Sequence, residues 1–182
     1  MPLMKLSNVT LIFTQNMTRE SEYGGWNYSF VIDKSEFCNK VRDALETQKK
    51  QVWASSKNTD AFILSKCNAK SKDNVTYEPA AAMMSDNDIL VQVKSKNAPI
   101  ENSKKVPLGR GTTADILIDV FEYEYGKKQF ICIRSHAERG CTVKVNDLKE
   151  HASAIKYFDY EATDTGIADN IDSVYQTEEE LF

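Results

Sequence analysis

The residues of this sequence that could do chemistry are aromatic side chains beside positive charges. A single-stranded nucleic acid needs both, because unstacked bases lie on flat rings and phosphates pair with cations; stacking is worth about 1–3 kcal/mol per base and reads no sequence. The stacking candidates are Tyr123, Tyr125, Trp26, Tyr28 and Tyr23. The candidate phosphate contacts are Lys94, Lys96, Lys104, Lys105, Arg110, Lys127, Lys128 and Arg134. Together they favour a surface that binds a nucleic-acid strand.

The aromatic candidates differ in how clearly they indicate a ligand. Tyr123 and Tyr125 alternate with two glutamates just before a turn at Gly126, so a strand would place both rings on the face opposite the acids. Their place beside a turn favours exposure and stacking. Trp26 and Tyr28 share a strand face with a phenylalanine, and a role in the core explains them equally well.

Signals for enzymatic chemistry are nearly absent. His136 and His151 stand in no metal-binding or catalytic-triad pattern. Cys132 and Cys141 could join His136 as zinc ligands, but their spacing matches no standard site, and small buried thiols are the simpler interpretation of all four cysteines. The sequence therefore predicts a protein that is not an enzyme and holds no metal or cofactor.

The last 24 residues are strongly acidic. Residues 159–182 hold eight acids and no lysine or arginine, whereas residues 1–158 hold 23 basic and 19 acidic groups, a net charge of +4. Acids at this density repel one another and resist packing. We expect a binding body over residues 1–158 and a disordered interaction tail over residues 159–182, which could compete with a polyanion for the body. The tail ends in Glu178, Glu179, Glu180, Leu181 and Phe182.

The residue pattern predicts a mainly β body with one helix. Alternating or β-rich segments predict strands over residues 6–13, 26–32, 61–67, 88–94, 116–121, 129–135 and 142–148. Asp33 and Glu36 fit a capping box for an amphipathic helix that runs to about Trp53, and residues 68–87 are expected to wander over the surface. Hairpin spacing favours a small closed β-barrel over an α/β sheet. No segment has the roughly 20 apolar residues of a membrane span.

Three segments resemble a known family. The first is the glycine-rich loop from Leu108 to Thr113, which leads through a strand to Tyr123 and Tyr125. The second is the strand over residues 28–32, which runs into the helix that starts near residue 34. The third is the acidic tail that ends in Phe182. In their order and spacing they resemble the single-stranded DNA-binding proteins of T-seven-type, short-tailed bacteriophages.

This resemblance implies an OB-fold, a five-stranded Greek-key barrel, with the amphipathic helix inserted. It also implies binding of single-stranded DNA without sequence preference in phage DNA replication and recombination, with strand annealing, in the cytoplasm of the infected bacterial host. The expected partners of the tail are the phage DNA polymerase, which would take Phe182 into an apolar pocket, and the helicase/primase. Members of the family also tend to form homodimers.

The sequence departs from the family pattern at one strand. Asp115 and Asp119 stand where basic residues would be more natural, and Glu122 and Glu124 bracket Tyr123. Either these acids face away from the nucleic acid, or the affinity is modest and depends strongly on salt. The alternative hypothesis is a protein–protein regulator or inhibitor of a host nucleic-acid enzyme that mimics DNA. A mimic should be acidic throughout its fold, and the positive body counts against it.

Overall fold

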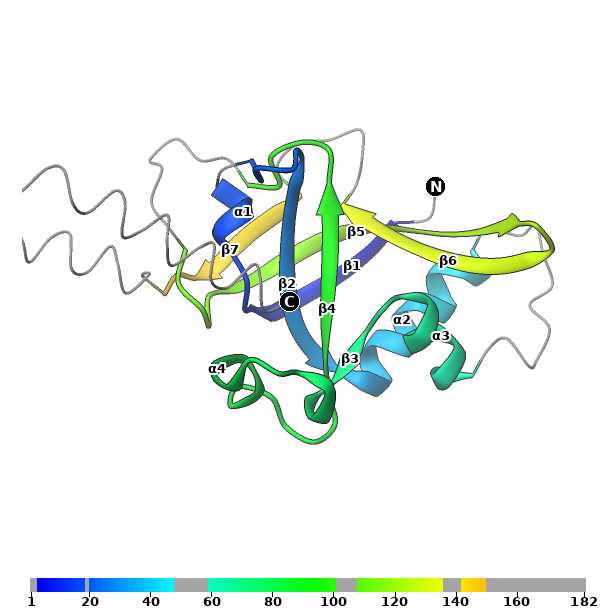
Figure 1. The fold of residues 1–182 in the computed structure, drawn as a ribbon, viewed down its shortest axis with the longest axis horizontal. Coiled ribbons are helices and arrows are strands. Elements are labelled where there is room, and N and C mark those ends of the chain that lie inside the picture. The colour runs from blue at the N-terminus through cyan, green and yellow to red at the C-terminus, as the bar shows by residue number, and fades with distance from the viewer. Residues whose placement is uncertain (1–2, 19, 48–58, 101–107, 136–141, 150–182) are drawn as a thin grey trace, which may run out of the picture.

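The computed structural model describes residues 3–18, 20–47, 59–100, 108–135 and 142–149 (Figure 1). Lys104, Lys105 and the interaction tail lie outside these ranges, so neither the tail nor the division at residue 158 is described. The elements in chain order are β1 (Leu3–Leu11), α1 (Gln15–Thr18), β2 (Trp26–Asp33), α2 (Lys34–Glu46), α3 (Asp60–Lys66), β3 (Lys70–Ser71), a 3₁₀ turn (Lys72–Asn74), α4 (Glu78–Ala81), β4 (Asp88–Ser95), β5 (Thr113–Tyr125), β6 (Lys128–Ser135) and β7 (Val143–Asp147).

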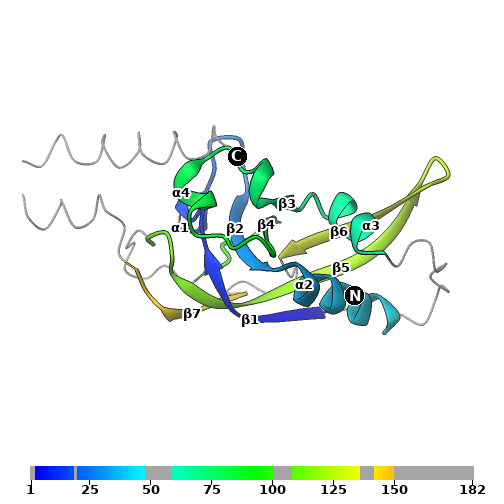
Figure 2. The same ribbon diagram turned by 90° about the horizontal axis from the view of Figure 1, so that it is seen from below.

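One curled antiparallel sheet contains all the strands of the described residues, in the order β3-β4-β2-β1-β5-β6, with β7 beside β5. Five strands have eight or more residues: β1, β2, β4, β5 and β6. β1 pairs with β2 on one edge and with β5 on the other, and β2 also pairs with β4. β6 pairs with β5 and curls back beside β4 (Figure 2). This strand order is that of an OB barrel. The predicted mainly β, OB-like class is confirmed, and β3 and β7 are short additions.

The central strands form because every second side chain enters one core. Tyr28, Phe30 and Ile32 of β2 meet the inward residues of β4, and α2 covers the same core with Phe37 and Val41. The opposite face of these two strands is covered as well, because Val31 and Leu90 belong to a second, smaller apolar cluster. The predicted strands over residues 26–32 and 88–94 are confirmed with small changes at their ends.

The cap predicted for α2 is present. The Asp33 carboxylate accepts a hydrogen bond of 3.0 Å from the backbone N–H of Glu36, which satisfies one of the free donors at the start of the helix. The helix ends at Glu46, followed by Thr47, and residues 48–53, into which we expected it to continue, lie outside the described residues. Within the described ranges, no helix combines the length and the apolar character needed to span a bilayer.

The strand predicted over residues 61–67 is wrong, because this segment forms the helix α3. Its consecutive apolar residues show no clear period, so the pattern cannot separate helix from strand. The N-cap favours the helix, because the hydroxyl oxygen of Thr59 accepts a hydrogen bond of 3.3 Å from the Phe62 backbone N–H. An ion pair between Arg42 of α2 and Asp60 of α3 holds the start of α3 against α2. Residues 68–87 also contain α4, which covers a smaller apolar cluster around Phe13 and Leu90.

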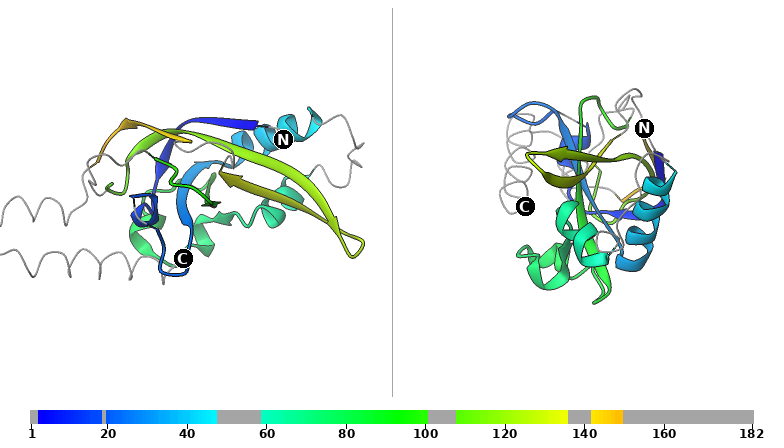
Figure 3. Two further views of the ribbon diagram at one scale, coloured as in Figure 1. Left: turned by 90° about the horizontal axis from the view of Figure 1, so that it is seen from above. Right: turned by 90° about the vertical axis from the view of Figure 1, so that its right-hand side faces the viewer.

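The longest strand, β5, extends beyond the body of the protein. One edge pairs with β1 as far as Asp119, while the other edge pairs first with β7 and then with β6 from Ile118 to Tyr125. Past Asp119 the only described partner of β5 is β6. The two strands therefore leave the body as a two-stranded hairpin, which Figure 3 shows projecting at the right of its left-hand view.

A tight turn closes this hairpin. Tyr125 pairs with Lys128, so Gly126 and Lys127 form a two-residue loop, and both have a positive φ, +56° and +65°. Two consecutive positive φ values define a type I′ turn, whose twist matches that of the flanking strands. The predicted turn at Gly126 and the returning strand are confirmed.

Replacing Gly126 by alanine should lower the free energy of unfolding by about 1 kcal/mol, because an L residue is strained in this conformation. A Cβ at this position would meet nothing within 4 Å, so the cost comes from the backbone alone. Urea unfolding of the two proteins measures it. Equal stabilities would contradict the described turn geometry.

Candidate nucleic-acid interface

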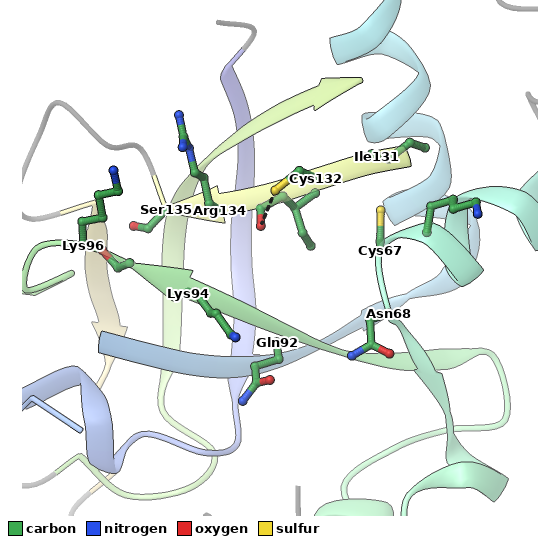
Figure 4. Close-up of a pocket in the computed structure, with 12 residues that line it drawn as sticks. Cys67, Asn68, Gln92, Lys94, Lys96, Ile131, Cys132, Arg134 and Ser135 are labelled. Atoms are coloured by element: carbon green, nitrogen blue, oxygen red, sulfur yellow. Dashed lines mark hydrogen bonds between the residues drawn. The ribbon is translucent and has the colours of Figure 1, made fainter. Parts of the chain in front are cut away.

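A groove of about 410 Å³ lies between β4 and β6 (Figure 4). In the described part of the chain these two strands lie side by side without a ladder of backbone hydrogen bonds. The barrel, which we expected to be closed, is therefore open along this seam. The described residues that line the groove include four cationic side chains and no acidic one. Its lining residues are Lys66, Cys67, Asn68, Gln92, Lys94, Ser95, Lys96, Ile131, Cys132, Ile133, Arg134 and Ser135.

Strand alternation places the β4 side chains. Val91 and Val93 enter the core, so Gln92 and Lys94 lie on the opposite face and reach the groove. Lys94 and Lys96 are exposed, and neither forms an ion pair with an acid of the described residues. Their positive charge is therefore available to an anionic ligand.

The end of α3 supplies the lower wall of the groove. Asn68 has a φ of +53°, and the backbone N–H of Ala69 donates to the carbonyl of Leu64 at 3.0 Å, the geometry of a helix C-terminus with a left-handed residue. Asparagine tolerates this conformation better than most residues. The turn stops the helix directly after Lys66, so this lysine and Asn68 both line the groove.

A row of three rings covers the outer face of the hairpin. Phe121 and Tyr123 of β5 lie 6.1 Å apart between centroids, and Tyr123 stacks on Phe130 of β6 at 5.2 Å with 17° between the planes. Tyr123 is 45% exposed and Tyr125, nearer the tip, is 78% exposed. We call Phe121, Tyr123 and Phe130 the aromatic row. It offers flat surface next to the groove.

Two cations of the groove contact the aromatic row. The Arg134 guanidinium lies 4.9 Å from the centroid of Phe121, and the Lys66 ammonium lies 5.0 Å from the centroid of Phe130. Both contacts are within the range of cation–π attraction. The groove and the row are therefore one continuous surface, and the exposed Lys127 and Lys128 extend its positive charge to the hairpin tip.

A second aromatic group lies near the C-terminal end of β4. Trp26 pairs with Ser95, which lines the groove, and Trp26 is half-buried. Tyr23 is 90% exposed on the loop before it, where Gly24 and Gly25 both have a positive φ. The register thus brings Trp26 to the end of the groove that carries Lys94 and Lys96, and Tyr23 precedes it by three residues.

Two of the sequence-predicted site residues lie elsewhere. Tyr28 is 0% exposed in the core between the sheet and α2, so the stacking role is wrong for it and the core alternative holds. Arg110 does not line the groove; its guanidinium donates to the Tyr77 hydroxyl at 2.8 Å and stacks on the same ring. Lys104, Lys105 and the tail residues lie outside the described residues.

The acids that depart from the family pattern have structural positions. Asp115 accepts hydrogen bonds from the Asn146 side chain at 2.8 Å and from the Asn8 backbone at 2.9 Å, and these bonds lower the pKa of its carboxyl. Asn8 has a φ of +54° and lies where the β1–β5 register shifts, so Asp115 holds a bulge. Asp119 is buried directly opposite Arg134 in the β5–β6 ladder.

The two glutamates beside the tyrosines lie on the other face of the hairpin. Glu122 and Glu124 alternate with the rings along β5, as the sequence predicts, and neither lines the groove. They share this face with Ile131, which pairs with Glu122 and lines the groove.

The cysteines of the groove are neutral thiols. Burial raises the pKa of Cys67 to about 12 and raises that of Cys132 as well, so both stay protonated at neutral pH. A protonated thiol is a poor nucleophile and a poor metal ligand. The described residues contain no group of three or more His, Cys, Asp and Glu side chains arranged for a metal ion. Cys38 and Cys67 are buried, as predicted for small apolar side chains, whereas Cys132 is only half-buried. Cys141 lies outside the described residues.

Sequence reasoning missed Lys66, Phe121 and Phe130. Lys66 lies in a segment that we predicted as a strand, so its position at the end of a helix beside the groove could not be inferred. Phe130 could have been found from the turn alone, because a two-residue loop at Gly126 places it directly opposite Tyr123.

No family model matches the chain, and no curated protein matches it. Among solved structures, the chain is similar to the single-stranded DNA-binding protein of bacteriophage Enc34, with 15% identity over 92% of this chain and 89% of that chain and a TM-score of 0.49. The Enc34 protein in complex with single-stranded DNA covers 83% of this chain and 89% of its own, at 15% identity and a TM-score of 0.46. The gp2.5 protein of bacteriophage T7 covers 90% and 96%, at 10% identity and a TM-score of 0.46. The similar structures are single-stranded DNA-binding proteins of phages, the kind of protein that the sequence motifs resemble.

Proposed function

We propose that this protein binds single-stranded DNA without sequence preference, with the groove taking phosphates and the aromatic row taking bases. The observation that carries the proposal is the contact between the two: Arg134 and Lys66 line the groove and also lie over Phe121 and Phe130. Cations and flat rings side by side are what a flexible strand with unstacked bases requires.

The surface suits a single strand better than a duplex. In a duplex the base faces are stacked on one another, so the rings of the row could meet only the edges or the backbone. A single strand can lay its bases on Tyr123 and Tyr125 while its phosphates follow Lys94 and Lys96. Because every base has a flat face, the binding is tolerant of sequence.

We further propose that the tail regulates this binding and recruits replication proteins. The groove holds four cations and no acid, so it attracts any flexible polyanion, including residues 159–182 of the same chain. A tail released from the groove by DNA is then available to a phage DNA polymerase or helicase/primase through Leu181 and Phe182. This arrangement fits a role in phage DNA replication, recombination and strand annealing in the host cytoplasm.

The first prediction concerns the groove cations. Wild-type protein should bind a fluorescent 30-nucleotide oligo-dT more tightly than a duplex of the same length, with an affinity that falls as salt rises. Replacing Lys94 and Lys96 together by glutamine should reduce the slope of log K against log salt by about 1.4, since each phosphate contact with a single strand contributes about 0.7. Fluorescence anisotropy over a salt series measures both.

A matched control keeps the loss of charge but moves it away from the groove. Lys40 and Lys144 are exposed and do not line it, so the double glutamine variant at these positions should keep the wild-type slope. If wild-type protein and the protein without its tail both fail to bind oligo-dT at low salt, single-strand binding is wrong, and the search moves to a protein target.

The second prediction concerns stacking. Replacing Tyr123 and Tyr125 by alanine should weaken oligo-dT binding by at least tenfold at every salt concentration, because stacking on each ring is worth about 1–3 kcal/mol. Both side chains are exposed, so the melting temperature should change little. Anisotropy and thermal unfolding report the two effects, and an unchanged affinity would remove the stacking role.

The third prediction concerns the tail. Deleting residues 159–182 removes eight acids and should raise the affinity for oligo-dT, most of all at low salt, where the tail's charge is least screened. Titrations of the full chain and the deletion at matched salt concentrations test this. Identical affinities across the whole salt range would show that the tail does not compete for the groove.

A further inference from the structure

The two outer rings of the aromatic row have cations over them. Phe121 lies under Arg134, and Phe130 stacks with Tyr123 and also contacts Lys66. A cation at 4.9 or 5.0 Å from a ring centroid occupies space that a stacked base would need. The ring faces that these cations cover are therefore closed to a base in the arrangement that the structure shows.

We infer that Phe121 and Phe130 are base-stacking positions that Arg134 and Lys66 cap in the DNA-free protein, and that DNA exchanges each cation from ring to phosphate. This inference rests on the proposed binding of single-stranded DNA and goes beyond it by assigning four coupled residues. Each pair has the same construction, with a cation that lines the groove and a ring on the outer face of the hairpin.

The direction of the exchange follows from the strengths of the contacts. A phosphate forms charge-assisted hydrogen bonds with guanidinium and ammonium groups, which are stronger than the attraction of a cation to an exposed ring. A strand in the groove thus draws both cations off the rings. Each ring then loses its partner and gains a base, so a ring is uncovered only when a phosphate is beside it.

The exchange predicts different effects on the binding of strands with and without bases, whereas simple packing of the cations on the rings does not. A strand without bases can draw the cations away but leaves the rings bare, whereas a normal strand fills them. A ring that is replaced by leucine should therefore lose stacking with normal DNA and release its cation for a strand that has phosphates only.

The test compares two probes on the full chain: a 30-nucleotide oligo-dT and an abasic strand of equal length. Phe121→Leu and Phe130→Leu should each weaken oligo-dT binding by at least about fivefold. The same variants should bind the abasic strand as tightly as wild type or more tightly, because the cation no longer has to leave the replaced ring. Equal losses on both probes, or no loss on oligo-dT, would overturn the inference.

A matched control removes the same kind of contact elsewhere. Arg110 lies 5.0 Å from the ring centroid of Tyr77 and does not line the groove, so Tyr77→Leu should leave both affinities at the wild-type value. If wild-type protein binds neither probe, the proposed function itself fails. Binding of oligo-dT with equal losses on both probes contradicts the exchange alone.

A variant with its rings intact covers the case in which the leucine variants do not fold. Lys66→Gln removes one phosphate contact and uncaps Phe130 at the same time. Its loss of affinity should be smaller than that of Lys94→Gln on both probes, because Lys66 must leave a ring to reach a phosphate, whereas Lys94 lines the same groove and has no ring to leave. Equal losses for the two variants would show that Lys66 does not cap Phe130.

Discussion

The structure depends on one strand that is longer than the body it belongs to. β5 has 13 residues, and its first part pairs with β1 on one edge and with β7 and then β6 on the other. In that part Ala114, Ile116 and Ile118 face the core. Beyond Asp119 the strand keeps only β6 as a described partner. A single strand thus builds the barrel and carries the aromatic row out of it.

The open seam of the barrel follows from the same constraint. Because β6 follows β5 outward, its other edge lies beside β4 without a backbone ladder, and polar side chains of both strands line the gap. A fully closed barrel would bury this edge and leave no groove. The length over which β5 and β6 pair thus determines both the core on one side and the cationic groove on the other.

Much of this architecture is visible in the sequence, because alternation is a local signal. Trp26 to Ile32 shows the period of a strand buried on one face, and the turn at Gly126 needs no knowledge of distant residues. The helix α3 was not predicted, because its apolar run has no clear period and its N-cap, Thr59, was not recognised. The second core under α4 escaped as well, since it joins Phe13 to Leu90.

The site was harder to predict than the fold, because its residues meet only through long-range pairing. Tyr123 and Tyr125 were recognised from local pattern, but Lys66 reaches Phe130 across 64 positions of sequence. Tyr28 shows the opposite limit: its type and spacing suit stacking equally well, and only the packing of α2 on the sheet places it inside. The role of Asp115 likewise required its contact with Asn8.

The hairpin has a consequence for how molecules of this protein meet one another. From Glu122 to Tyr125 one edge of β5 faces no described strand, and such an edge can template the addition of a strand from a second molecule. Glu122 and Glu124 place two negative charges there, and a copy aligned on this edge would bring like charges together. Like charges placed opposite one another disfavour strand pairing, so the acids beside the tyrosines weigh against edge-to-edge addition of a second hairpin.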